Sequence, residues 1–134
     1  MSQTIKGKSA EEHPFAKLIG LSESKLEDGY SECILEVEER HFNPNRVLHG
    51  GVIYSMADTG MGGALYTTLN RGESCATIEI KISYFRPVSN GAIICKTRII
   101  NRGKSVATLE SEVFNGGKIV AKAMGTYSIF KIGP

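Results

Sequence analysis

The sequence lacks the features that mark nucleic-acid-binding, secreted and metal-binding proteins. Its 134 residues carry a net charge of only +2, and no run of five or more like charges offers a surface for nucleic acid. The first residues lack the apolar core of a signal peptide. The three cysteines form no C-x-x-C pair, and the three histidines lack metal-ligand spacing. We therefore predict a cytoplasmic protein without a bound metal, a nucleic-acid partner or a membrane partner.

Two further absences narrow the class of protein. The apolar stretch at residues 50–70 contains five glycines, several hydroxyl side chains and the acid Asp58, which excludes a transmembrane span. The G-x-S-x-G signature of α/β serine hydrolases is missing. The length suits one domain, and we predict a flexible tail at residues 1–12 before a single domain at residues 13–134.

Hydrophobic periodicity predicts the order of the secondary structure elements. A short helix at residues 14–19 precedes two strands, near residues 21–27 and 30–39. A long helix follows from about Gly50 to Leu69. Period-two alternation then predicts four strands, near residues 76–85, 92–100, 106–114 and 117–130. This order predicts an α+β domain in which an antiparallel sheet covers a single long helix.

The long helix has two distinct faces. Helical spacing gathers a buried stripe, made of Ile53, Met56, Ala57, Gly60 and Ala64. A second face surrounds Asp58 and lacks the charges expected beside water; it holds Tyr54, Ser55, Met61, Gly62 and Leu65. We predict that this second face contacts another subunit, because an isolated chain would expose it to solvent. In the strand after the helix, alternation places Ile78, Ile80, Ile82 and Tyr84 on one face.

Asp58 is the only charged residue between Gly50 and Asn70. Because burying a carboxylate costs several kcal/mol without compensation, Asp58 is either a structural acid satisfied by a hydroxyl group or a catalytic nucleophile or base. The Gly50 and Gly51 amides at the helix start form a candidate oxyanion hole, or else a tight turn. Gly50 and Asp58 lie about 12 Å apart along the helix axis. If both act on one carbonyl group, the acid must come from a neighbouring subunit.

Several motifs together resemble one enzyme family. They are Asn43, L-H-G-G at Leu48 to Gly51, Asp58, Y-F-R-P at Tyr84 to Pro87, and R-G-K-S at Arg102 to Ser105. This combination is similar to hotdog-fold acyl-CoA thioesterases of the PaaI-like, phenylacetic acid degradation branch of the 4-hydroxybenzoyl-CoA thioesterase superfamily. The likeness runs from about His13 to Phe130. It implies a hotdog fold, in which a curved antiparallel sheet wraps around one long central helix.

The resemblance also implies an activity and an assembly. Members hydrolyse an acyl-CoA thioester to a free carboxylate and CoA, and they need no cofactor besides the CoA of the substrate. They form homodimers with shared active sites, which commonly pair into homotetramers. In this chain the acyl group remains open between aryl-acetyl, hydroxybenzoyl and medium-chain fatty acyl groups. Candidate pocket or core residues are Tyr54, Met56, Met61, Leu65 and Tyr66.

Catalytic roles follow from the same resemblance. Asp58 matches the catalytic acid, and Gly50 matches the amide that polarises the substrate carbonyl group. Asn43 matches the polar residue that positions water or the acid, and Thr77 matches a hydroxyl residue on the following strand. Beside these matches, His49 is a candidate that orients the loop or lines the site, or else has the structural role that a lone histidine before a helix more often has. The glycine and the asparagine come from one subunit and the acid from its partner.

The CoA phosphates require cations near the edge of the sheet. The candidate CoA-binding residues are Tyr84, Arg86, Pro87, Arg102, Gly103, Lys104 and Ser105. Simpler interpretations stand beside these roles. Alternation places Thr77 with Glu79 as an exposed strand residue, Asn43 before Pro44 suits a plain turn, and residues 101–105 suit a solvated hairpin turn.

Two other functions compete with thioester hydrolysis. A hotdog enoyl-CoA hydratase is one, because N-P-N-R-V-L-H-G-G faintly resembles the D-x-N-P-x-H motif of that family, although the aspartate is missing and the histidine is displaced. A non-catalytic acyl-CoA-binding protein is the other. Within the thioesterase hypothesis, Asp58 either attacks the carbonyl carbon to give a mixed anhydride or draws a proton from water.

Overall fold

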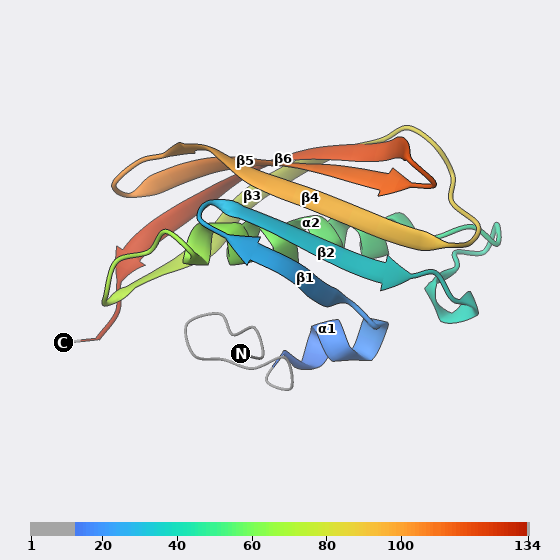
Figure 1. Cartoon of the computed structure of the whole chain (residues 1–134), viewed down its shortest axis with the longest axis horizontal. Coiled ribbons are helices and arrows are strands. Elements are labelled where there is room, and N and C mark those ends of the chain that lie inside the picture. The colour runs from blue at the N-terminus through green and yellow to red at the C-terminus, as the bar shows by residue number, and fades with distance from the viewer. Residues whose placement is uncertain (1–12, 134) are drawn as a thin grey trace.

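The structure is a computed structural model that describes residues 13–133. The predicted tail at residues 1–12 lies outside the described residues. The elements are α1 (Pro14–Ile19), β1 (Ser22–Glu27), β2 (Tyr30–Glu36), η2 (Glu39–His41), α2 (Gly50–Tyr66), β3 (Glu73–Tyr84), β4 (Ala92–Arg102), β5 (Val106–Asn115) and β6 (Lys118–Lys131). Figure 1 shows the sheet arching over α2. The predicted hotdog architecture is confirmed, with α2 ending at Tyr66 rather than at Leu69.

All six strands form one antiparallel sheet in the order β1-β2-β4-β5-β6-β3. β1 and β3 are therefore the two edge strands. β1 has six residues and a register irregularity between Glu23 and Lys25, whereas β3 has twelve residues that pair only with β6. Among the described residues, β3 is thus the long open edge of the sheet, with unpaired backbone groups facing outward.

A β-bulge in β3 corrects the face assignment made from alternation. The sequence pattern placed Ile78 with Ile80 and Ile82, but the pairing register shifts between Thr77 and Glu79. Ile78 is the extra residue of the bulge and is 57% exposed, while Ile80 and Ile82 pack against the core. The bulge also turns Thr77 toward α2. Strict alternation cannot reveal a single inserted residue.

α2 packs its predicted stripe against the sheet, and all five stripe residues are buried. Gly60 lies where the helix comes closest to β2 and β4. A Cβ atom on Gly60 would lie 2.7 Å from Thr97 Oγ1, and the Ser31 hydroxyl donates to the Gly60 carbonyl at 2.7 Å. A glycine is therefore needed here for the close approach of helix and sheet.

The second helix face, which we predicted to contact another subunit, is only partly exposed in the single chain. Met61 and Leu65 are fully buried beside sheet residues such as Ile80 and Tyr127. Tyr54 is 36% exposed, and Asp58 is partly exposed. The strongly curved sheet wraps around a wider arc of the helix than the buried stripe suggests. Met56, Met61 and Leu65 are core residues, so of the candidate acyl-pocket residues only the two tyrosines reach the surface.

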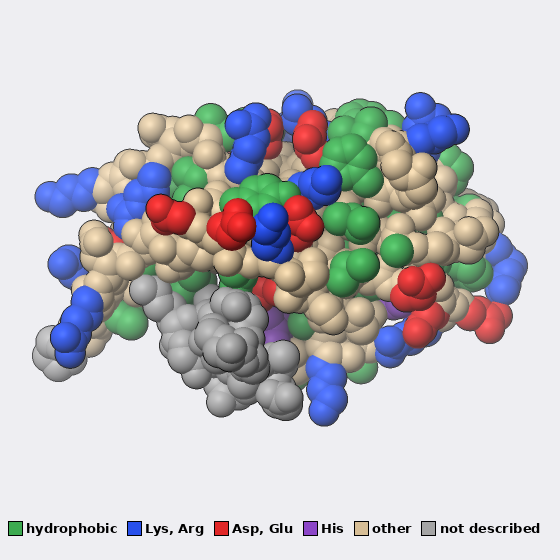
Figure 2. Space-filling view, in the orientation of Figure 1, with side chains coloured by type: hydrophobic (Ala, Val, Ile, Leu, Met, Phe, Trp, Pro, Cys, Tyr) green, Lys and Arg blue, Asp and Glu red, His purple; other side chains and the backbone are tan. Residues whose placement is uncertain are grey.

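The outer face of the sheet carries charges of both signs. Glu110 is 9% exposed and pairs with Arg98 and with Lys122, which also lies 3.8 Å from Glu112. Figure 2 shows lysine and arginine side chains interspersed with acidic ones on this face. Opposite charges on neighbouring strands stabilise their pairing, and their mixture agrees with the small net charge.

Candidate active site

The first turn of α2 leaves one backbone amide unpaired. His49 is the N-cap residue, and its Nδ1 accepts the Gly51 N–H at 2.7 Å. The Val52 N–H donates to the His49 carbonyl at 3.0 Å. Within residues 13–133 the Gly50 N–H has no hydrogen-bond partner. This amide lies at the positive end of the helix dipole, where it can donate to a carbonyl oxygen that gains negative charge.

Tyr84, the last residue of β3, contacts Gly50. Its hydroxyl donates to the Gly50 carbonyl at 2.7 Å. A Cβ atom on residue 50 would lie 2.9 Å from the Tyr84 ring, so a side chain there would displace the ring. Burial, with a smaller contribution from Tyr54, raises the pKa of Tyr84, which keeps its hydroxyl protonated as a donor at neutral pH. Gly50 is therefore required by its close contact with β3.

Asp58 projects from the middle of α2 toward β3 and β6. The Thr77 hydroxyl donates to Asp58 Oδ1 at 2.8 Å, and the Tyr127 hydroxyl donates to the same oxygen at 2.5 Å. The main-chain carbonyl of Asp58 also lies 2.9 Å from the Tyr127 hydroxyl. Among the described side chains and backbone groups, none donates a hydrogen bond to Oδ2. One carboxylate oxygen is therefore held in place, and the other is free to react.

Tyr127 is the site residue that sequence reasoning missed. It is 2% exposed and pairs directly opposite Thr77 in the β3–β6 ladder. Burial, and then the hydrogen bond to Asp58, raise the pKa of Tyr127 well above its ordinary value, so the hydroxyl remains a neutral donor. A signal was present in the sequence: alternation along β6 places this tyrosine among the inward-facing residues, and a buried phenol needs a hydrogen-bond partner.

Asn43 lies in the loop before α2. Its side-chain oxygen accepts the Asn45 N–H at 2.9 Å and the Val47 N–H at 3.3 Å, which shapes the turn. Its side-chain amide nitrogen donates no hydrogen bond within the part of the chain that the structure describes. Asn43 therefore shapes the loop and still has an unused donor.

The predicted CoA-binding residues lie near opposite ends of α2. Tyr84 is beside the helix start, with Arg86 and Pro87 exposed in the next loop. Arg102 lies beyond the other end, where its guanidinium donates to Glu73 at 2.8 Å and to the Thr68 carbonyl at 3.3 Å. The rest of that turn holds Gly103, which is partly exposed, and Lys104 and Ser105, which are exposed. A single chain thus brings Gly50 near Tyr84 and Asp58 near Thr77, but it does not join the two CoA-binding segments.

The described residues contain neither a cluster of metal-binding side chains nor a helix that could cross a membrane. Within residues 13–133, no group of three or more His, Cys, Asp or Glu side chains is arranged to hold a metal ion. In the same region no helix combines the length and the apolar character needed to cross a membrane.

Comparisons with known proteins identify the family and the fold. Residues 45–122 match the family model of the thioesterase superfamily, a range that includes Gly50, Asp58 and Thr77 but excludes Tyr127. Acyl-coenzyme A thioesterase 13 of Mus musculus is 31% identical over 97 residues, covering 70% of this chain and 69% of that protein.

Solved structures give a wider match. The conserved protein PA5202 from Pseudomonas aeruginosa has a TM-score of 0.83 at 34% identity, with 87% of this chain and 93% of that chain covered. A variant of the phenylacetic acid degradation protein PaaI from Thermus thermophilus has a TM-score of 0.80 at 28% identity, with 86% and 97% covered. The fold is therefore shared along nearly the full length of these proteins.

Proposed function

Because this chain belongs to the thioesterase superfamily and is a thioester hydrolase of the hotdog fold, we propose that its substrate is an aryl- or medium-chain acyl-CoA. The products are a free carboxylate and CoA. One observation carries the chemistry: two hydroxyl groups hold one oxygen of the Asp58 carboxylate and leave the other free. The name of the murine relative supports a CoA ester as the substrate.

The proposed reaction uses the free amide and the free carboxylate oxygen. The Gly50 N–H donates to the thioester carbonyl oxygen and stabilises its negative charge in the transition state. Asp58 Oδ2 either attacks the carbonyl carbon, expelling the CoA thiolate and leaving a mixed anhydride that water cleaves, or takes the proton of an attacking water. In a single-turnover reaction, hydroxylamine attack on the aspartyl carbon of the anhydride leaves a hydroxamate on Asp58, which the water route cannot form, so the mass of the protein distinguishes the two routes.

The two reactive groups belong to different chains in this proposal. The eight residues between Gly50 and Asp58 separate them by about 12 Å along α2, too far for both to contact one carbonyl group. β3 is an open edge strand. It contacts Gly50 of α2 through Tyr84 and Asp58 of α2 through Thr77. A second copy that pairs antiparallel with β3, about an axis near Ile80 and Lys81, brings Tyr84 of one chain opposite Thr77 of the partner subunit.

The same dimer joins the two candidate CoA-binding segments. Antiparallel pairing of the two β3 strands places the Arg86 end of one chain near the end of the partner that carries residues 102–105. Arg102 is already engaged by Glu73, so Arg86 and Lys104 are the exposed cations that we propose for the CoA phosphates. Pairing of two dimers into a homotetramer stays a prediction.

The first test measures thiol release from a panel of aryl- and alkyl-acyl-CoAs. We expect wild-type turnover, and we expect Asp58→Asn to lower kcat by at least about 1,000-fold while folding and CoA binding are retained. Asp28→Asn, which changes an exposed acid in a turn, is the matched control and should keep full activity.

The alternatives give different results in the same experiment. Full activity in Asp58→Asn would contradict the assignment of the catalytic acid. Tight acyl-CoA binding without thiol release would favour a binding protein. Loss of enoyl absorbance from crotonyl-CoA would instead favour the hydratase.

A further inference from the structure

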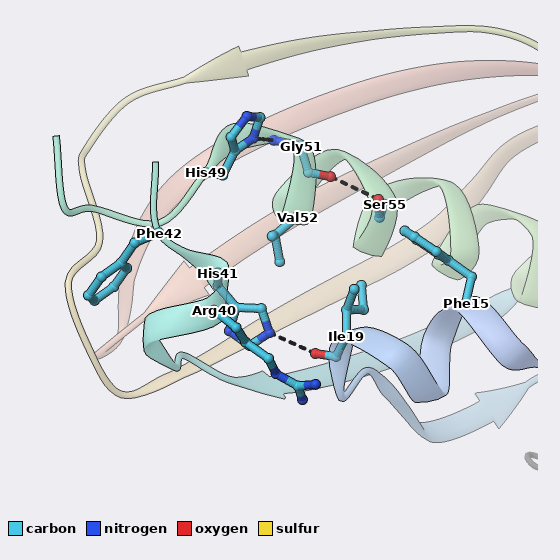
Figure 3. A pocket seen from close by; sticks show the side chains of 9 residues that line it. All are labelled: Phe15, Ile19, Arg40, His41, Phe42, His49, Gly51, Val52 and Ser55. Atoms are coloured by element: carbon cyan, nitrogen blue, oxygen red, sulfur yellow. Dashed lines mark hydrogen bonds between the residues drawn. The ribbon is translucent and has the colours of Figure 1, made fainter. Parts of the chain in front are cut away.

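A cavity of about 220 Å³ lies between α1 and the first two turns of α2 (Figure 3). Phe15 and Ile19 of α1 form one wall, and Val52 of α2 and Phe42 contribute further apolar surface. Figure 3 shows Phe15 pointing from α1 toward α2. His49 and Gly51 also line the cavity, and these two residues flank Gly50 in the sequence. The cavity therefore lies beside the amide that we propose as the carbonyl-binding donor.

Side chains of the segment before α2 hold the α1 wall in place. Arg40 Nη1 donates to the Leu18 carbonyl at 2.6 Å, and His41 Nε2 donates to the Ile19 carbonyl at 2.8 Å. His41 is only 3% exposed, and its Nδ1 accepts the Glu38 N–H at 2.9 Å. These bonds to the last carbonyls of α1 make it a fixed wall, although it is only six residues long.

Most polar groups around the cavity already have partners; the exceptions are His49 Nε2 and Arg40 Nη2, which have none among the described residues. Both ring nitrogens of His41 are hydrogen-bonded, and Ser55 Oγ donates to the Gly51 carbonyl at 2.8 Å. The Gly51 N–H donates to His49, and the Arg40 guanidinium pairs with Glu38 at 2.7 Å. Because the apolar side chains of Phe15, Ile19, Phe42 and Val52 line the cavity and few donors remain, an apolar group fits it.

The cavity is open to the surface, and its volume indicates the size of the group that it can enclose. A dry apolar cavity of about 150 Å³ binds benzene, whereas sites for drug-sized ligands begin at about 300 Å³. The observed cavity lies between these limits and suits a ring with one or two further atoms. We propose that this cavity binds the acyl group of the substrate and selects compact apolar groups, aromatic or branched, over long saturated chains, with Phe15 and Val52 setting the limit. This inference rests on the proposed function.

The first experiment fills the cavity with Val52→Phe. We expect kcat/KM for phenylacetyl-CoA to fall by at least about 10-fold, because the ring loses its space. Acetyl-CoA is the matched control substrate, since its methyl group is too small to need the space that Val52→Phe fills, and its kcat/KM should change by less than about 2-fold. Equal effects on both substrates, or no effect on either, would overturn the proposal.

The second experiment opens the cavity with Phe15→Ala, a change at a 49% exposed position that the fold tolerates. We expect the preference for phenylacetyl-CoA over lauroyl-CoA to fall by about 5-fold or more. Leu18→Ala is the control, because Leu18 is on the same helix, is 66% exposed and does not line the cavity. An unchanged preference in Phe15→Ala, or an equal change in Leu18→Ala, would contradict the inference.

A binding measurement separates this inference from the proposed function. Phenacyl-CoA, a ketone analogue that cannot be hydrolysed, should bind the wild type at least about 10-fold more tightly than it binds Val52→Phe. If acyl-CoAs are not hydrolysed but this difference holds, the cavity assignment stands and the hydrolase function fails. If the analogue binds both proteins equally or binds neither, the cavity assignment fails.

Discussion

At the scale of single residues, the two oxygens of the Asp58 carboxylate are not equivalent. Thr77 and Tyr127 face each other across β3 and β6, and both donate to Oδ1. Hydrogen bonds to a charged acceptor are stronger than those between neutral groups. Together the two donors fix the rotation of the carboxylate, so that Oδ2 is presented to a substrate without a search through rotamers. If Asp58 is the catalytic acid, as we propose, Thr77 and Tyr127 act through it as positioning residues.

Removing the Tyr127 hydroxyl tests this positioning. In Tyr127→Phe we expect kcat to fall by about 10- to 100-fold while KM changes by less than about 2-fold, because a hydrogen bond to a charged group contributes about 1.5–3 kcal/mol. Steady-state kinetics with one acyl-CoA measures both values. Tyr30→Phe is the matched control, since this partly buried hydroxyl donates to Glu32 and not to Asp58. Equal losses in the two variants would indicate a merely structural role.

The candidate site was predictable from sequence only where its signal is local. Asp58 stands out as the single charge in a long helix, and Gly50 as a glycine at its start. Thr77 entered through family resemblance alone, because the bulge at Ile78 reverses the face that alternation assigns to it. Tyr127 is 69 residues away from Asp58, and only the pairing of β6 with β3 brings them together.

At the scale of secondary structure elements, β1 carries an acid that the proposed chemistry does not use. Glu23 points at α2, and its Oε2 is buried without a hydrogen-bond partner. This oxygen occupies the space that a Cβ atom on Gly63 would need, next to Leu26. Burial raises the pKa of Glu23 to about 7. The folded state therefore favours the protonated carboxyl group, which links the packing of β1 on α2 to pH.

The sign of this linkage gives a stability prediction. The pKa of Glu23 is higher in the folded protein than in the unfolded chain, so the stabilising effect is complete below pH 4.5 and is lost as the pH rises through about 7. Because Glu23 is only half-buried, we expect a loss of about 1–2 kcal/mol in the free energy of unfolding between pH 5 and pH 8.

Urea denaturation of the wild type and of Glu23→Gln at both pH values measures this loss. The variant cannot ionise at this position, so its free energy of unfolding should fall by about 1–2 kcal/mol less over the same interval. Glu27→Gln, at an exposed position on the same strand, is the control. Parallel pH curves for the wild type and Glu23→Gln would exclude Glu23 as the source.

The secondary structure elements could be predicted from the sequence more readily than the contacts between them. Period-two alternation located the strands, and the stripe of helix α2 is buried as predicted. The burial of Met61 and Leu65 was missed because it depends on the curvature of the whole sheet, and residue spacing along one helix carries no information about it. Sheet order and register are likewise set by contacts between distant segments.

At the scale of the whole molecule, the proposed mechanism gives one chain two half-sites and no complete one. Gly50 and Asp58 are fixed on the same helix, and each is anchored to a different part of β3. A symmetric dimer about the edge of β3 would complete two identical sites, each with the amide of one chain and the acid of the other. In this proposal the open edge and the divided chemistry require the same partner, a second copy of the chain.

Complementation between two inactive variants tests this division of labour. Gly50→Pro removes the proposed donor; the backbone accepts proline because Gly50 is the first helical residue and His49 already has a ψ of 132°, although the proline Cβ meets the Tyr84 ring as any side chain would. Gly50→Ala is the matched control, because it adds the same contact with Tyr84 but keeps the N–H. We expect Gly50→Pro to be at least about 100-fold less active than Gly50→Ala.

The decisive species is a heterodimer of Gly50→Pro and Asp58→Asn, purified through two different tags after co-expression. If each site takes its amide from one chain and its acid from the other, one of the two sites is intact, and the heterodimer should show about half of the wild-type activity. If both groups of a site came from the same chain, each chain would lack one of them and the heterodimer would be inactive. Thiol release by the purified heterodimer, compared with the two homodimers at equal concentration, therefore decides whether catalysis requires two chains.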